Sequence, residues 1–214
     1  MYAESVSCPV GESHCILLDE VRQLRKQVIT DPLTGLFNVR HFRNSMEQEL
    51  ERTRRTGEPV TLMMVDLDHF KSINDTWGHE SGNVVLKTVA DLLQTQTRKL
   101  DICCRYGGEE FAVILPATQL MLAKQVAERF RMALEGLDID LGETSINVTA
   151  SIGIAVSDGR SGDEVPTLIT RADECLYEAK HNGRNCVIGH AQKMPESSVT
   201  LDERDALRGL FSDD

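Results

Sequence analysis

The sequence of 214 residues predicts an α+β fold, in which one sheet is covered by helices. Short apolar runs of strand length alternate with amphipathic segments of helical length along most of the chain. Two of these runs, 102–106 and 111–115, lie on either side of Gly107-Gly108, a pair that is typical of a tight hairpin with positive φ. Hydrophobic residues make up 41% and charged residues 27% of the chain, as in ordinary globular domains. The order of the strands in the sheet stays open.

The first segment, residues 1–30, is predicted to be a lead that ends in a short helix. Leu17, Val21, Leu24 and Val28 fall on one narrow apolar stripe, while the other faces of this helix are charged. Such a helix either folds back on its own domain or pairs with a second copy of the chain as a coiled coil. We favour the coiled coil, because the stripe is narrow.

The predicted domain spans residues 31–189, and its elements follow one another in a regular order. Apolar residues at helical spacing predict helices, and continuous or alternating apolar runs predict strands. The last helix is expected to end at Asn182-Gly183 in a left-handed turn. The predicted helices are 37–55, 80–97, 119–135 and 165–181, and the predicted strands are 60–65, 102–106, 111–115, 147–156 and 186–188.

Charge and composition exclude several classes of function. With a formal net charge of −11, the chain lacks the overall positive charge that is typical of a protein that binds nucleic acid or an anionic membrane. No apolar run approaches the roughly 18 residues of a membrane span, and no basic region precedes an apolar one at the start, so we expect a cytoplasmic protein. Residues 190–214 are predicted to form an acidic tail. The cysteines form no CxxC pair and are expected to be reduced, and Cys8, His14 and Cys15 lack a clear fourth ligand for a metal site.

The strongest candidate site centres on three acidic positions. Glu109 and Glu110 follow the two-glycine turn, and Asp66 follows a buried strand. If the two strands are neighbours, these carboxylates converge and suit a pair of Mg²⁺ ions held against phosphate oxygens. The amides of residues 69–71, at the start of a helical turn, would add donors to a phosphate. The alternatives are a plain solvated hairpin and an Asp66 that caps a helix.

Basic side chains suited to a polyphosphate lie at the end of the last predicted helix. Lys180 and Arg184 are four residues apart, a spacing that keeps their charged ends together. Pairs of this kind are also common at helix C-termini, because cations complement the helix dipole. That structural explanation stays open for this pair.

Together these residues resemble the motifs of GGDEF-domain diguanylate cyclases, with the glutamate version of the signature. The resemblance covers residues 31–189, and the motifs occur in the order and at the spacing of the family. The motifs are Asp31-Pro32-Leu33-Thr34-Gly35-Leu36, Asp66-Leu67-Asp68-His69-Phe70-Lys71, Asn74-Asp75, Gly78-His79, Arg105-Tyr106-Gly107-Gly108-Glu109-Glu110-Phe111, Ala172-Asp173, Tyr177, and Ala179-Lys180 followed by Gly183-Arg184-Asn185.

The resemblance implies a central, mostly antiparallel sheet flanked by helices and related to the palm of nucleotidyl cyclases. It implies that two GTP molecules, one on each facing domain of a homodimer, condense to cyclic di-GMP with loss of two pyrophosphates. Two Mg²⁺ ions per active site, with Mn²⁺ as the alternative, would be held by Asp66, the carbonyl of Leu67 and Glu109. Glu109 is also the implied base for the ribose 3′-hydroxyl, with Glu110 as an additional acidic group beside it.

The same resemblance assigns the substrate and product contacts. Arg98 and Asp101 match the family's inhibitory RxxD site, which implies feedback by cyclic di-GMP. The alternative for this pair is a surface salt bridge of little energetic value. The implied substrate-binding residues are His69, Phe70, Lys71, Asn74, His79, Asn83, Lys180 and Arg184, with Asn74 at the guanine and Lys71, Lys180 and Arg184 on the phosphate side.

Two positions depart from the family pattern: Asn83, where Asp is usual, and Val39, where Arg is frequent. A carboxylate accepts from two guanine N–H groups at once, whereas Asn83 accepts only with its amide oxygen. We therefore expect weaker discrimination between GTP and ATP, with some adenine-containing product, unless Asn83 merely caps its helix and Asn74 reads the base. A different class of function, a non-catalytic receptor that binds cyclic di-GMP through Arg98 and Asp101, is disfavoured because the chain retains the Gly-Gly-acid turn.

Overall fold

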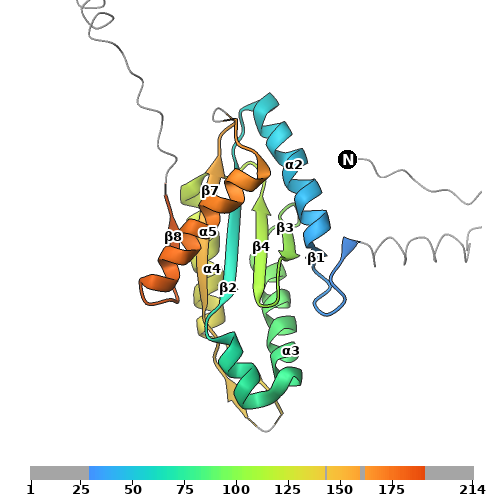
Figure 1. Cartoon of the computed structure of the whole chain (residues 1–214), viewed down its shortest axis with the longest axis vertical. Helices are drawn as coiled ribbons and strands as arrows, with labels where there is room; N and C mark the ends of the chain where they lie inside the picture. Colours follow the sequence, from blue (N-terminus) through green and yellow to red (C-terminus); the bar gives the residue numbers. More distant parts are fainter. Residues whose placement is uncertain (1–28, 143, 160–161, 191–214) are drawn as a thin grey trace, which may run out of the picture.

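The computed structural model describes residues 29–142, 144–159 and 162–190 (Figure 1). The helix predicted near Leu17 to Val28, the cysteines and histidine near the chain start, and the tail from residue 191 onward lie outside the described residues. None of the described helices is both long enough and apolar enough to cross a membrane.

One mixed sheet organises the described residues. Its strand order is β1-β3-β4-β2-β7-β8. The three central pairs, β3–β4, β4–β2 and β2–β7, are antiparallel, and only the outer pairs β1–β3 and β7–β8 are parallel. The strands of this sheet are β1 (Phe37–Asn38), β2 (Val60–Leu67), β3 (Ile102–Arg105), β4 (Glu110–Leu115), β7 (Ala150–Ser157) and β8 (Val187–Gly189). The predicted α+β class with a mostly antiparallel sheet is therefore confirmed.

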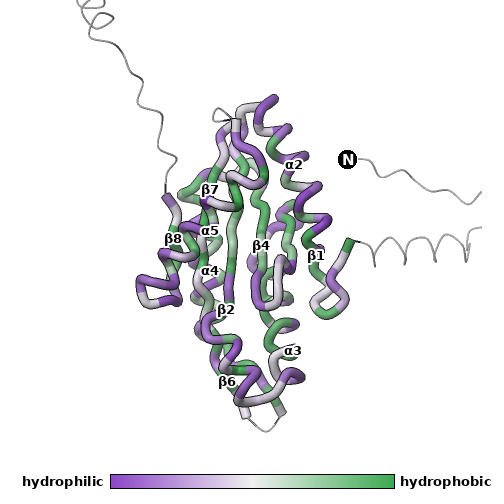
Figure 2. Tube along the Cα trace, in the orientation of Figure 1, coloured by the Kyte–Doolittle hydropathy of each residue, from purple (hydrophilic) through white to green (hydrophobic). Residues whose placement is uncertain are grey.

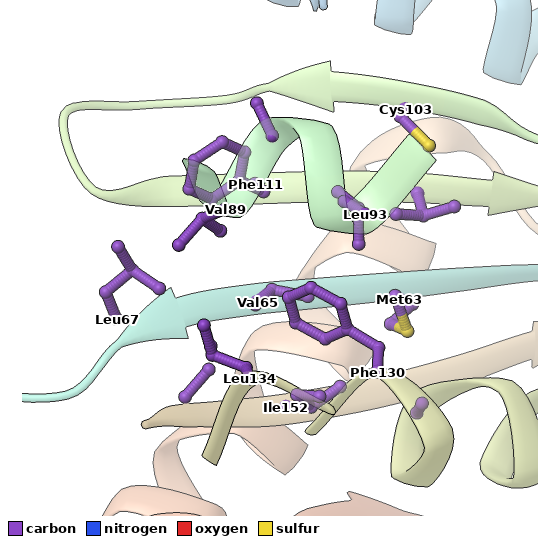
Figure 3. Close-up of a cluster of buried hydrophobic side chains, with 14 of the residues drawn as sticks. Met63, Val65, Leu67, Val89, Leu93, Cys103, Phe111, Phe130, Leu134 and Ile152 are labelled. Atoms are coloured by element: carbon purple, nitrogen blue, oxygen red, sulfur yellow. The ribbon is translucent and has the colours of Figure 1, made fainter. Parts of the chain in front are cut away.

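Helices cover both faces of this sheet. They are α2 (Val39–Thr56), α3 (Phe70–Gln96), α4 (Leu120–Glu135) and α5 (Val165–His181). Side chains of α3 and α4 form one hydrophobic cluster with Met63, Val65 and Leu67 of β2 (Figure 3). Side chains of α2 and α5 form the other cluster with Leu62 and Met64. Because both faces of β2 are buried, the strand is a continuous apolar run, and Figure 2 shows the hydrophobic character of the central strands.

Successive side chains of β2 point to opposite faces of the sheet, and Asp66 lies on the face that α5 covers. It follows Leu62 and Met64 at even spacing along β2, and these residues pack toward α2 and α5. Gly153 of β7 lets the backbone of α5 approach closely, because a Cβ there would collide with the carbonyl of Ala172 and the backbone of Leu176. The end of β2 that carries Asp66 is therefore held close to the C-terminal half of α5.

Several element boundaries differ from the sequence prediction. Helix α2 begins at Val39, since the side chain of Asn38 accepts a hydrogen bond from the His41 amide and Phe37–Asn38 pairs with β3. Helix α3 already begins at Phe70, and its two parts meet at Gly78, whose φ of 80° and ψ of 163° are not helical. A separate small hairpin, β5 (Ile139–Asp140) with β6 (Ser145–Ile146), was not predicted, and β7 begins at Ala150 rather than at residue 147.

Candidate functional site

The turn between β3 and β4 presents the two predicted glutamates. The amides of Tyr106 and Gly107 both donate to the carbonyl of Glu110, at 2.8 and 3.1 Å. The prediction that the two glycines supply positive φ is wrong, because neither Gly107 nor Gly108 adopts the left-handed region. Gly107 leaves space instead, since a Cβ at this position would meet Oε2 of Glu110 and the carboxylate would have to shift. The absent side chain lets the Glu110 carboxylate lie against the turn.

Asp66 lies on the strand next to this turn, as the predicted site requires. In the sheet register Asp66 is opposite Glu110 on β4 and opposite Ser151 on β7. The amide of Leu67 donates to the carbonyl of Glu109 at 3.3 Å. Asp66 is not the cap of α3, because the N-cap position belongs to His69. The two acidic elements are thus direct neighbours, although they lie far apart in the sequence.

An ammonium group on α5 lies beside these carboxylates. Nζ of Lys180, on α5, is 2.8 Å from Oδ2 of Asp66. Burial raises the pKa of Glu109, and the negative charge of Asp66 raises it further, while Lys180 opposes the rise. Burial and the charge of Asp66 likewise raise the pKa of Glu110, with smaller contributions from Asp173 and Glu109. The site therefore carries more negative charge than one lysine neutralises, which favours the binding of further cations.

The donors at this site fit a hard divalent cation. Asp66 and Glu109 offer carboxylate oxygens, and Leu67, which follows Asp66 and whose amide bonds to the carbonyl of Glu109, offers a backbone carbonyl as a third oxygen. Within the described ranges, no group of three or more His, Cys, Asp or Glu side chains is arranged to hold a metal ion by itself. An ion bound at Asp66 and Glu109 would complete its coordination with water or substrate oxygens, which is usual for Mg²⁺.

The start of α3 lies directly after Asp66 and supplies amide groups. His69 adopts a left-handed conformation with φ of 57° and ψ of 23°, and its side chain makes no capping hydrogen bond. Its carbonyl accepts from the amides of Ser72 and Ile73, which fixes the first turn. Phe70 is buried and anchors the turn to the core, while Lys71 is exposed beside it. The amides of Phe70 and Lys71, which have no acceptor among the described residues, are therefore available to an anion next to the acidic cluster.

The residues predicted at the base lie on either side of the break in α3. A Cβ on Gly82 would collide with Oδ1 of Asn74, so this glycine allows Asn74 to lie against the second part of the helix. Asn83 is adjacent to Gly82 and half-buried, and its side chain makes no hydrogen bond with the described residues. It is not at the N-cap of α3, so the capping alternative gains no support here. His79 is exposed and directly follows the break at Gly78.

Lys180 and Arg184 separate at the end of α5. Lys180 contacts Asp66, whereas Arg184 lies in a left-handed turn formed by Gly183, Arg184 and Asn185, with φ of 102°, 66° and 45°. The amide of Arg184 donates to the carbonyl of Ala179 at 3.1 Å, which closes the helix. The predicted left-handed exit is confirmed, and it extends over two residues beyond the glycine. The exposed guanidinium of Arg184 forms no ion pair within the part of the chain that the structure describes.

Arg98 and Asp101 form a separate turn before β3, at the strand end opposite to the glutamates. The amide of Arg98 donates to Oδ2 of Asp101 at 2.7 Å, and the amide of Asp101 donates to the carbonyl of Arg98 at 3.0 Å. Their side chains form no salt bridge, so the predicted alternative of a surface ion pair is not what the described residues show. Both residues line a pocket of about 800 Å³ that also includes Thr30 and Phe37. The guanidinium of Arg98 is thus available to a ligand in this pocket.

Sequence reasoning missed two carboxylates that support the site. Asp31 accepts from Nη1 of Arg105 at 3.3 Å, and Nη2 of the same arginine donates to the carbonyl of Gly108 at 2.8 Å. Through Arg105, these contacts link Asp31, at the start of the predicted domain, with the turn that carries Glu109. Asp68 is the second case, because it is buried although no role was predicted for it. The sequence shows this acidic residue in the motif that follows β2, but its burial could not be read from the sequence.

Comparison with known proteins is consistent with this geometry. A family model described as "Diguanylate cyclase, GGDEF domain" matches residues 28–186. Response regulator PleD of Caulobacter vibrioides is 44% identical over 165 residues, which cover 76% of this chain and 36% of that protein. Diguanylate cyclase A of Treponema denticola is 38% identical over 178 residues, which cover 82% of this chain and 48% of that protein. This chain therefore spans about a third to a half of the length of these curated relatives.

Solved structures show the same relationship. The diguanylate cyclase SiaD of Pseudomonas aeruginosa, in complex with its activator SiaC, aligns with a TM-score of 0.75 and 39% identity over 82% of this chain and 66% of that chain. The coiled coil and GGDEF domain of DgcB from Caulobacter crescentus, in complex with c-di-GMP, aligns with a TM-score of 0.77 and 30% identity over 81% of this chain and 92% of that chain. The active GGEEF domain of a diguanylate cyclase from Vibrio cholerae aligns with a TM-score of 0.67 and 30% identity over 73% of this chain and 98% of that chain.

Proposed function

This chain belongs to the GGDEF-domain family of diguanylate cyclases, and from that premise we propose that it condenses two GTP molecules into cyclic di-GMP and two pyrophosphates. One observation carries the proposal: Asp66 and Glu109 lie on paired segments around the ammonium of Lys180, next to the first turn of α3. Carboxylates, a cation and free amides are what a metal-bound nucleoside triphosphate requires.

The metal ligands of the proposal are Asp66, the carbonyl of Leu67 and Glu109. Bound there, two Mg²⁺ ions per site, or Mn²⁺ as the alternative, would acidify the attacking hydroxyl and neutralise charge on the leaving pyrophosphate. The raised pKa values of Glu109 and Glu110 support this assignment, because like-charged carboxylates in one partly buried site are relieved by an added cation.

The side chains then have distinct roles in the transfer. The 3′-oxygen of one GTP forms a bond to the α-phosphorus of the other, and the bond between the α- and β-phosphates breaks, once for each of the two linkages. Glu109 is the proposed acceptor of the 3′-hydroxyl proton, with Glu110 beside it, since a carboxylate with a raised pKa is a better base near neutral pH. Lys71, Lys180, Arg184 and the first-turn amides of α3 would bind the phosphate oxygens.

The product requires two copies of the site. One domain holds one GTP, so a symmetric cyclic dinucleotide forms only where two domains face each other, and the proposal therefore includes a homodimer at least during catalysis. The GTP substrate places the proposed reaction in the cytoplasm. We assign feedback inhibition by cyclic di-GMP to Arg98 and Asp101, because the exposed arginine and the pocket of about 800 Å³ beside it offer room and charge for a nucleotide.

A second candidate function, a cyclic dinucleotide synthase with relaxed base specificity, rests on Asn83. Its side chain has no hydrogen-bond partner among the described residues and lies next to the position where Asn74 packs on Gly82. An amide at this position offers one acceptor oxygen to the guanine edge, whereas a carboxylate would offer two. Mixed products from GTP and ATP follow from that difference.

One experiment separates these functions. The protein is incubated with Mg²⁺ and GTP, ATP or both, and the products are identified by mass spectrometry, with Glu109→Gln as the matched variant. The proposal predicts cyclic di-GMP from GTP, and a loss of more than about a hundredfold in Glu109→Gln, because a general base contributes at least that much. No product from the wild type, together with Arg98-dependent binding of cyclic di-GMP, would instead identify a receptor.

A further inference from the structure

Asp68 is a buried carboxylate that the proposed reaction does not use. Asp68 is only 5% exposed, and both of its carboxylate oxygens accept hydrogen bonds from neighbouring elements. Ser151 Oγ donates to Oδ1 at 2.6 Å, and Thr149 Oγ1 donates to Oδ2 at 2.7 Å. The third donor is the backbone amide of Asn185, at 3.0 Å from Oδ2. Asp68 therefore connects the end of β2 to the turn that follows α5.

That turn is held in a conformation that its residues do not favour. Arg184 and Asn185 both have positive φ, of 66° and 45°, although neither is a glycine. Such a conformation persists only where surrounding contacts determine it. Asn185 supplies those contacts, because its Nδ2 donates to Oε1 of Glu135 at 2.8 Å and its Oδ1 accepts from Nη1 of Arg131 at 2.9 Å. The turn is thus fixed by α4 on one side and by Asp68 on the other.

The same carboxylate lies between two elements that the proposed function assigns to the substrate phosphates. Asp68 directly precedes the first turn of α3, and its own amide donates to the carbonyl of Thr149 at 2.9 Å. Through Asn185 it also fixes the backbone next to Arg184, whose guanidinium is exposed and has no ion-pair partner within the described ranges. A long, exposed arginine side chain binds a phosphate well only if its backbone is held in place.

We propose that Asp68 is a positioning residue, which, together with the side chain of Asn185, holds the 183–185 turn so that Arg184 reaches the phosphates of the bound nucleotide. This inference rests on the proposed function, because it assigns Arg184 to the substrate. Asp68 itself touches no reacting atom. Its effect is transmitted through the hydrogen bond to the Asn185 amide and is therefore coupled to Arg184.

A double-mutant cycle on the full chain tests this coupling. KM for GTP is measured together with calorimetric binding of a GTP analogue that has a methylene bridge between the α- and β-phosphates. Arg184→Ala is expected to raise KM and to weaken binding of the analogue about tenfold, the usual effect of losing a charged hydrogen bond. Asp68→Ala is expected to cause a similar loss. In the Asp68→Ala background, Arg184→Ala should then cost less than about twofold, since its contribution is already lost.

Two further variants distinguish a loss of the positioning of Arg184 from a general loss of protein stability. Asp68→Asn keeps an oxygen for the Asn185 amide and turns its NH₂ toward a hydroxyl that can accept, so it should restore most of the affinity. Asp163→Ala is the control, because Asp163 is also a buried carboxylate but pairs with Arg171 far from the site. It should lower the melting temperature while leaving KM and the tenfold effect of Arg184→Ala unchanged.

Asn185→Gly keeps the test valid if Asp68→Ala does not fold. Glycine tolerates the positive φ and retains the backbone amide, yet it loses both contacts to α4, so the effect of Arg184→Ala should shrink in this background as well. Independent effects, in which Arg184→Ala costs about tenfold in every background, would overturn the positioning role while the cyclase activity stands. A wild type that neither binds the analogue nor forms product would overturn the proposed function itself.

Discussion

Nζ of Lys180 lies 2.8 Å from Oδ2 of Asp66, so α5 contributes its charge to the acidic cluster formed by β2 and the β3–β4 turn. The lysine opposes the raised pKa values of both Glu109 and Glu110. Lys180 occupies one oxygen of Asp66 in this structure, and under the proposed function it would have to share or leave this oxygen when cations and phosphates bind. The ammonium of Lys180 thus pairs with a proposed metal ligand, Asp66, and is itself a proposed ligand of the substrate phosphates.

Removing this charge should shift the pH dependence of the reaction. In Lys180→Met the pKa of Glu109 rises further, so a higher pH is needed to obtain the deprotonated base. The acidic limb of the kcat profile is therefore expected to move to higher pH, and kcat at neutral pH to fall at least about tenfold. Lys180→Arg keeps the charge and should leave the position of the acidic limb unchanged. An acidic limb that does not move in Lys180→Met would contradict this account of the site.

The contact between Asp31 and Arg105 should make stability depend on pH. Burial tends to raise the pKa of Asp31, but hydrogen bonds from Thr34 and the charge of Arg105 outweigh it, so the pKa is lowered in the folded state. The contribution is fully present above the unfolded value of 3.8 and is lost as pH falls through the folded pKa. Asp31→Asn should lose about 1 kcal/mol at pH 7 and should lack this pH-dependent part.

Urea unfolding between pH 6 and acid conditions measures this difference. The free energy of unfolding of the wild type should approach that of Asp31→Asn as the carboxyl is protonated. A constant difference between the two proteins across that range would show that the charge of Asp31 does not contribute. Asp140→Asn is a suitable control, because among the described residues this exposed carboxylate accepts a hydrogen bond only from the amide of Gly142, in the small hairpin.

The identity of residue 83 should control base selection. In an equimolar mixture of GTP and ATP, the wild type is expected to form some adenine-containing product. Asn83→Asp should raise the preference for GTP by about tenfold, because the second acceptor oxygen satisfies a guanine donor. Mass spectrometry of the products gives the ratio directly. Exclusive formation of cyclic di-GMP by the wild type would mean that another residue, with Asn74 as the first candidate, reads the base.

Product feedback should depend on the turn before β3. Arg98→Ala is expected to weaken inhibition by cyclic di-GMP at least about tenfold without changing kcat at low product concentration, because the turn lies at the opposite end of β3 from the glutamates. Lys99→Ala, at a neighbouring residue of the same pocket, is the charge-matched control. Initial rates are measured with added cyclic di-GMP. Equal inhibition of Arg98→Ala and the wild type would mean that the product does not inhibit through Arg98.

The sequence predicted much of this arrangement because many of its signals are local. The apolar run of β2 and the spacing along α5 are read from neighbouring residues, and both elements are found where they were predicted. The first part of α3 was missed because Gly78 interrupts the helical period. The buried hydrogen bonds of Asp68 come from Thr149, Ser151 and Asn185, which lie far away in the sequence, so no local pattern predicts them.

A crystal structure with Mn²⁺ and the methylene-bridged GTP analogue tests the central assignment most directly, since anomalous scattering locates the ions. The account predicts Mn²⁺ within about 2.3 Å of carboxylate oxygens from both Asp66 and Glu109, with Lys180 displaced toward the phosphates. An analogue bound with no ion between these two carboxylates, and with Lys180 still paired to Asp66, would contradict it.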